Sequence, residues 1–170
     1  MRSIIFYIIT LFTVGFIFSS CEKKDYPAGL TELEHHYYAL FVPNNNSAVT
    51  VSRSQTALLK FPVQFYSTFT REYDAVAKYA VVTGGITGPA QRGVDFNIVD
   101  KNGTVIPSGD TTYSIVFPKA VQAMDTIYIK LLNNPATGVR KFEVQILDNI
   151  TSQFDVDIFS TAYRRPVTIN

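Results

Sequence analysis

Apolar and polar residues alternate with a period of two along most of the chain after residue 36. The run 58–66, LLKFPVQFY, places Leu59, Phe61, Val63 and Phe65 on one face, as expected for a half-buried strand. Comparable runs occupy residues 37–42, 78–83, 94–99, 112–117, 126–132, 141–147 and 163–169, with turn-forming residues between them. Short strands at such regular spacing predict an all-β chain, an antiparallel β-sandwich of about seven to nine strands. A closed barrel is the main alternative.

Three local features refine this prediction. Pro62 interrupts the 58–66 run, and because proline has no amide hydrogen for a ladder, it predicts an edge strand or a bulge. Asn102 and Gly103 separate residues 94–99 from a return at 104–106, which predicts a hairpin turn. Residues 73–79, YDAVAKY, are the best helical stretch, and they are short for a helix.

The chain starts with a segment that differs from the rest. Residues 4–18 are almost entirely apolar, Arg2 precedes them, and small residues follow, which is the pattern of a secretory signal peptide. A membrane-spanning helix usually needs about 20 apolar residues, so an uncleaved anchor is the less favoured alternative.

The apolar segment ends at Cys21, the one cysteine of the chain. Phe18-Ser19-Ser20-Cys21 resembles a bacterial lipobox, and this resemblance implies cleavage before Cys21, a diacylglycerol on its thiol and an acyl chain, such as palmitate, on its amino group. An ordinary signal peptide with an incidental cysteine is the alternative, but an exposed thiol is reactive and one cysteine forms no internal disulfide. The charged residues 22–25 resemble those of surface-displayed lipoproteins of Bacteroidetes-type bacteria, which implies a lipid-anchored protein of the outer membrane, displayed at the cell surface.

The predicted organisation is a signal peptide at 1–20, a lipidated N-terminus and flexible tether at 21–36, and one sandwich domain at 37–170. Removal of residues 1–20 takes away one basic residue, Arg2, so 14 basic residues then balance 14 acidic ones. This neutral domain has no basic surplus to attract nucleic acid.

Part of the second half resembles a Calx-beta-type repeat. The matching stretches are 92–96 (RGVDF), 103–110 (GTVIPSGD), 114–117 (SIVF) and 142–149 (FEVQILDN), within a similarity that covers roughly residues 80–169. The resemblance implies an immunoglobulin-like or Calx-beta-like sandwich.

Some Calx-beta members bind calcium through clustered acidic residues. The acidic residues available here as donors are Asp95, Asp125, Asp148, Asp155 and Asp157. Calcium takes 6–8 oxygen ligands, and the spacing of these aspartates shows no convergence. Aspartates of β-proteins mostly hydrogen-bond the backbone in turns. We therefore expect no cofactor, with calcium as the alternative.

The residue types used in catalysis give little support for an enzyme. His35 and His36 point to opposite sides of an extended chain and fall in the predicted tether, which favours solvated residues over a metal site. Glu143, or the pair Asp155 and Asp157, remains as an acid–base alternative. The glycine-rich stretch 82–89 lacks the lysine of a phosphate-binding loop, and no G-x-S-x-G motif is present.

Aromatic residues suggest a binding role. Nine Tyr and nine Phe remain after residue 20, because Tyr7 and four Phe lie in the signal segment. Sugars stack on aromatic rings, and Tyr66, Tyr73 and Tyr79, which flank predicted loops, are the ligand-binding candidates; core packing is the alternative. The expected function is a non-enzymatic envelope lipoprotein that acts as a binding or accessory module. The alternatives are a glycan-binding protein of a nutrient-uptake system and a structural or adhesion subunit, with glycans or outer-membrane proteins as partners.

Overall fold

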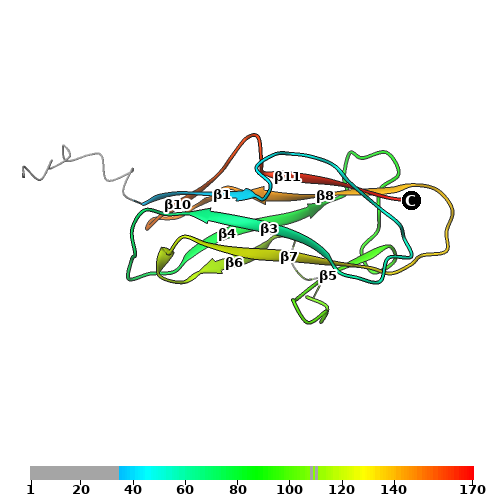
Figure 1. Ribbon diagram of the computed structural model, residues 1–170, viewed down its shortest axis with the longest axis horizontal. Coiled ribbons are helices and arrows are strands. Elements are labelled where there is room, and N and C mark those ends of the chain that lie inside the picture. Colours follow the sequence, from blue (N-terminus) through cyan, green and yellow to red (C-terminus); the bar gives the residue numbers. More distant parts are fainter. Residues whose placement is uncertain (1–34, 108, 110) are drawn as a thin grey trace, which may run out of the picture. The chain divides into compact units, whose positions relative to one another are not determined.

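A computed structural model describes residues 35–107, 109 and 111–170 of the 170-residue chain (Figure 1). These residues form eleven strands and one short 3-10 turn, η1 (Pro118–Ala120). The strands are β1 (His36–Phe41), β2 (Val49–Val51), β3 (Leu59–Tyr66), β4 (Ala75–Val82), β5 (Phe96–Val99), β6 (Tyr113–Phe117), β7 (Ala123–Leu131), β8 (Arg140–Leu147), β9 (Asn149–Ile150), β10 (Asp155–Ile158) and β11 (Arg164–Ile169).

The strands form two sheets, which confirms the predicted all-β sandwich. One sheet has six strands in the order β5-β7-β3-β1-β10-β9, and the other has five in the order β2-β11-β8-β4-β6. Most neighbours are antiparallel, but β1 with β10 and β2 with β11 are parallel. The count exceeds the predicted seven to nine because β2, β9 and β10 are short, with three, two and four residues, and lie outside the runs selected from the sequence.

The core follows the predicted alternation. Leu59, Phe61, Val63 and Phe65 of β3 are all buried, and so are Phe142, Val144 and Ile146 of β8 in the other sheet. Ring stacking joins the two sheets: Phe65 lies 4.5 Å from Phe117, and Phe96 lies 4.6 Å from Phe142, between ring centroids. The apolar faces of the two sheets therefore meet in one layer of side chains.

The prediction that Pro62 marks an edge or a bulge is wrong. β3 lies inside its sheet, between β7 and β1, and Pro62 pairs with Thr126 in an unbroken ladder. The Pro62 carbonyl accepts a hydrogen bond from the amide of Val42, just beyond the end of β1. The backbone N and C=O of a strand residue point to the same side. The nitrogen of Pro62, which carries no hydrogen, therefore faces Val42, one residue beyond the end of β1.

The helical alternative for residues 73–79 is also wrong, because most of this stretch belongs to β4. Ala75, Ala77 and Tyr79 point into the core, at the spacing of a strand. The predicted turn at 100–103 is confirmed: the Asp100 carboxylate accepts amide hydrogens from Asn102 and Thr104 at 2.8 and 2.9 Å. The stretch that returns from it makes one isolated bridge, from Val99 to Val105, and no strand.

The signal segment, Cys21 and residues 21–34 of the predicted tether lie outside the described residues. The last two residues of that tether, His35 and His36, belong to the folded part. The His35 carbonyl accepts the amide hydrogen of Asp155 at 3.0 Å, and β1 begins at His36, so pairing with β10 draws both residues into the sheet. Within the described ranges, no helix is long and apolar enough to cross a membrane.

Candidate functional site

The outer face of the six-stranded sheet carries a group of aromatic and acidic side chains near the start of β1. The alternation of side chains along each strand determines which residues point outward. β1 buries Tyr37 and Ala39, so His36 and Tyr38 point outward, and β10 buries Val156, so Asp155 and Asp157 point outward. With Tyr66 at the end of β3 and Phe159 after β10, these residues form what we call the aromatic–acidic face: His36, Tyr38, Tyr66, Asp155, Asp157 and Phe159.

Strand register brings the residues of this face together. Tyr38 of β1 is paired with Tyr66 of β3 on one side and with Asp157 of β10 on the other, so the three side chains form one row across three strands. The two tyrosines are 43% and 47% exposed, and their rings are thus open to solvent. Phe159, 41% exposed, meets the Tyr38 ring edge-on at 6.4 Å and extends the aromatic surface.

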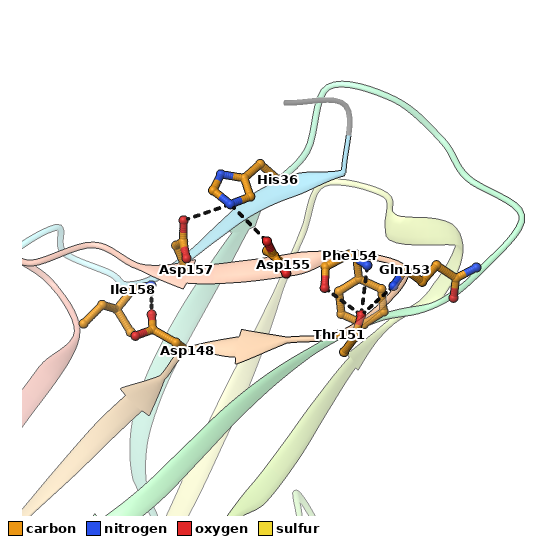
Figure 2. A network of polar contacts seen from close by, with 8 residues as sticks. All are labelled: His36, Asp148, Thr151, Gln153, Phe154, Asp155, Asp157 and Ile158. Carbon is orange, nitrogen blue, oxygen red and sulfur yellow. Dashed lines mark hydrogen bonds and ion pairs between the residues drawn. The ribbon is translucent and has the colours of Figure 1, made fainter. Parts of the chain in front are cut away.

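The acidic half of the face is organised by one imidazole. Nε2 of His36 lies 3.4 Å from Oδ2 of Asp155 and 3.4 Å from Oδ2 of Asp157, and Figure 2 shows the ring above both carboxylates. A protonated ring forms an ion pair with each of them, whereas a neutral ring leaves two negative charges beside the tyrosines. The His36 ring also lies edge-on to Tyr38 at 6.3 Å, which links the two halves.

Hydrogen bonds hold the β9–β10 hairpin that carries the carboxylates. The Thr151 hydroxyl donates to the Phe154 carbonyl at 2.6 Å and accepts the Phe154 amide hydrogen at 2.9 Å (Figure 2). Asp148 accepts the amide hydrogen of Ile158 at 2.9 Å, at the other end of β10. The backbone beneath Asp155 and Asp157 is therefore fixed at both ends.

Aromatic packing supports the face from inside. The Tyr73 hydroxyl lies 2.6 Å from the Tyr37 hydroxyl and 2.6 Å from Nδ1 of His35, and the Tyr73 ring stacks on Phe154 at 5.5 Å. Burial, followed by the hydrogen bond with Tyr37, raises the pKa of Tyr73 well above its usual value, so this phenol stays neutral. His35 and His36 thus face opposite sides, one toward this cluster and the other toward the carboxylates.

The three tyrosines selected from the sequence lie in different environments. Tyr66 belongs to the aromatic–acidic face. Tyr73 is half-buried and its hydroxyl is hydrogen-bonded, and Tyr79 is 5% exposed, with its ring 5.3 Å from that of Tyr113 in the interior. Tyr38 and the contact of His36 with the two aspartates were not predicted from the sequence. The alternation of β1 separates Tyr37 from Tyr38, but it does not tell which of them faces outward.

The five aspartates considered for calcium are dispersed. Asp95 is buried and accepts hydrogen bonds from the Gln91 amide and the Asn134 side chain, both at 2.7 Å. Asp125 accepts the amide hydrogen of Thr126, and Asp148 lies in the backbone contact described above. Asp155 and Asp157 lie close together, but both carboxylates approach Nε2 of His36. Across the described part of the chain, no group of three or more His, Cys, Asp or Glu side chains is arranged to hold a metal ion.

Two further candidates lie elsewhere. Glu143 faces outward on the five-stranded sheet, where it accepts a hydrogen bond from Gln145 at 2.8 Å, so it shares no site with Asp155 and Asp157. The glycine-rich stretch 82–89 connects β4 to β5. Gly88 has a φ of 70°, and a Cβ there would lie 2.9 Å from the Val139 carbonyl oxygen, which explains this glycine by packing.

Comparison with solved structures identifies the same architecture. The apo-form of the Calx CBD1 domain superposes with a TM-score of 0.50 at 15% identity, over 79% of this chain and 97% of that one. The fold is a Calx-beta-like sandwich. CBD12 from CALX1.2 gives a TM-score of 0.50 at 16% identity over 78% of this chain, which spans 44% of that longer structure. No protein-family model and no curated protein matches the chain.

Proposed function

We propose that this protein is a non-enzymatic, lipid-anchored binding module of the bacterial outer membrane, and that its aromatic–acidic face recognises a glycan. The row of Tyr66, Tyr38 and Asp157 is the observation that carries the proposal. Adjacent strands lie about 4.8 Å apart, so this row spans about 10 Å, the scale of a short oligosaccharide. Exposed rings offer flat apolar surfaces, and carboxylates accept hydrogen bonds from hydroxyl groups.

The arrangement of the carboxylates favours binding over catalysis. Glycosidases place two carboxyl groups on opposite sides of the bond that is broken. Asp155 and Asp157 instead stand side by side on one strand and approach the same imidazole. The proposal assigns no cofactor, because the five aspartates are either dispersed or engaged with His36 and backbone amides.

An adhesion or assembly role is the second candidate, and apolar residues at the border of the face favour it. Ile150 of β9 pairs with Asp155 and is 74% exposed, and Met124 of β7 pairs with Gln64 of β3 and is 56% exposed. Exposed apolar side chains that adjoin a polar cluster are typical of protein interaction sites. An outer-membrane protein is the partner that this second function implies.

A glycan array followed by calorimetry tests the first proposal on the full chain in detergent. We expect saturable binding of an oligosaccharide, and Tyr38→Ala or Tyr66→Ala should weaken it about tenfold or more, since each removes a stacking ring. Tyr38→Phe retains the ring and should keep most of the affinity. Val139→Ala, at an exposed valine away from the face, should leave the affinity unchanged.

Two results would contradict the glycan proposal. If no glycan binds, or if binding persists unchanged in the Tyr38→Ala, Tyr66→Ala double variant, the glycan proposal is wrong. Stable co-purification with an outer-membrane protein, lost on Ile150→Lys, would replace it with the assembly role.

A further inference from the structure

β6 differs from the other strands at the edges of the two sheets. Edge strands expose unpaired backbone groups, and proteins usually shorten, cover or charge them. β2 and β9 have three and two residues. β5 is covered on its outer side, where the Ile106 amide donates to the Ile98 carbonyl at 3.0 Å. β6 has five residues, Tyr-Ser-Ile-Val-Phe, with no charge, and within the described residues its pairing partner is β4 alone.

A slot lies along residues 114–116 of β6. Its volume is about 420 Å³, and Ser114, Ile115 and Val116 line it in succession. Neighbouring side chains of a strand point to opposite faces, so a slot lined by three consecutive residues borders the backbone edge itself. Residues 125–128 of β7 and the turn residues 100–102 also line it. Val116, 50% exposed, stands at the rim.

The charge in this slot is mostly negative. Asp125 belongs to the same face of β7 as Ile127, so it points between the sheets, yet it is exposed to solvent. Asp100 and Lys101 line the slot at the turn. No basic side chain among the described residues forms an ion pair with Asp125, and its carboxylate accepts a hydrogen bond from the amide of Thr126. A ligand that binds in the slot would therefore place a basic group of its own beside the Asp125 carboxylate.

We propose that β6 and this slot bind an extended peptide segment of a partner protein, which adds a strand to the five-stranded sheet and places a lysine or arginine beside Asp125. Strand addition supplies main-chain hydrogen bonds, and side-chain pockets supply selectivity. A second copy of this chain fits less well, because its β6 brings no basic residue and its Asp125 would add a second negative charge. The slot lies between the sheets, apart from the aromatic–acidic face, so the inference does not depend on glycan binding.

The test uses the full chain in detergent micelles and a fluorescein-labelled hexapeptide, Thr-Val-Lys-Val-Thr-Val. We expect saturable binding in fluorescence anisotropy, and hydrogen–deuterium exchange should show slower exchange at residues 114–117. Asp125→Asn should weaken binding about fivefold, the value of one partly exposed charge pair. Val116→Lys should weaken it about tenfold or more, because a long charged side chain on an uncharged edge strand opposes the addition of another strand.

Two controls separate the slot from general surface effects. Val94→Lys makes the same change at a valine that is 43% exposed and outside the slot, and it should bind the peptide like the wild type. A peptide with glutamate in place of lysine should bind several-fold more weakly. The proposal is overturned if the peptide shows no saturation up to about 1 mM, or if Val116→Lys and Asp125→Asn both bind it with unchanged affinity. Concentration-dependent dimerisation that Val116→Lys abolishes, without peptide binding, would also overturn it.

Discussion

Tyr37 and Tyr38 are neighbours with opposite roles. Tyr37 is 3% exposed and its hydroxyl contacts Tyr73, whereas Tyr38 is 43% exposed and stands in the row of the aromatic–acidic face. The difference follows from strand geometry alone, since consecutive side chains point to opposite sides. A tyrosine fits both places because its ring is apolar and its hydroxyl is polar. At the scale of single residues, orientation decides which tyrosine supports the fold and which one belongs to the proposed binding face.

Tyr79 gives a prediction for alkaline pH. Burial, reinforced by Tyr113 and Asp125 and opposed by Arg92, raises the pKa of Tyr79 to about 12 from an ordinary value near 10. The folded chain therefore holds this proton more tightly than the unfolded chain does. Its contribution to stability is complete below about pH 10 and is lost as the pH rises towards 12.

Urea unfolding at several pH values measures this effect. Between about pH 9 and pH 11.5, the free energy of unfolding should fall less steeply in Tyr79→Phe than in the wild type. Tyr66→Phe, at an exposed tyrosine, serves as the control and should follow the wild-type curve. Equal slopes for Tyr79→Phe and the wild type would contradict the assigned role of this phenol.

At the scale of the elements, the sequence predicts the long strands well and the pairing poorly. β3 and β8 are recognisable because each alternates over eight residues. Pro62 leads to a wrong prediction of an edge or a bulge. A proline is tolerated inside this sheet because β1 ends opposite it, and β1 is distant in the sequence. β2 and β9 are too short to carry a pattern. The aromatic–acidic face needs β3, β1 and β10 side by side, and no local periodicity encodes that order.

The connection between β7 and β8 provides a prediction at this scale. The Arg53 guanidinium, just after β2, donates to the carbonyls of Asn134 at 3.1 Å, Gly138 at 2.8 Å and Ala136, and to that of Asn170 at 3.2 Å. One side chain thus fixes a loop and the end of β11. Arg53→Met should lower the free energy of unfolding by about 1–3 kcal/mol, because several carbonyls lose a charged donor.

Hydrogen–deuterium exchange distinguishes this local role from a general loss of stability. In Arg53→Met, amides of residues 133–139 should exchange faster under native conditions, while those of β3 keep their protection. Arg53→Lys retains the charge but has one donor group. Its exchange rates at residues 133–139 should lie between those of the wild type and those of Arg53→Met. Uniformly faster exchange over the whole domain would argue against a local clamp.

At the scale of the whole molecule, a shared architecture says little about ligands. The Calx CBD1 domain has a similar fold at 15% identity, so most aligned residues differ, and similarity of fold does not give function. The function has to be argued from the faces of this chain and from its N-terminal motif. The lipid anchor at Cys21 is a prediction from the sequence, and Cys21 lies outside the described residues. If it is present, it holds the proposed binding face at the membrane.

Substitution of Cys21 tests the anchor. Two or more acyl chains hold a protein firmly on a membrane, since each buried methylene adds about 0.8 kcal/mol. Cys21→Ser should therefore move the chain from the membrane fraction to the soluble fraction, and mass spectrometry should show the loss of the acyl groups. A serine variant that remains in the membrane at the wild-type level would show that something other than acylation at residue 21 holds it.

The position of β1 determines how the domain responds to a pull. β1 is the first strand of the described residues, and it lies between β3, which runs antiparallel, and β10, which runs parallel. A force that enters at His36 and is directed along β1 acts across the hydrogen bonds to β3 rather than in line with them. These bonds share the load and must break together, in shear, instead of opening one at a time. A domain tethered by its N-terminus would thus resist fluid drag on a captured ligand through the same strand that displays Tyr38.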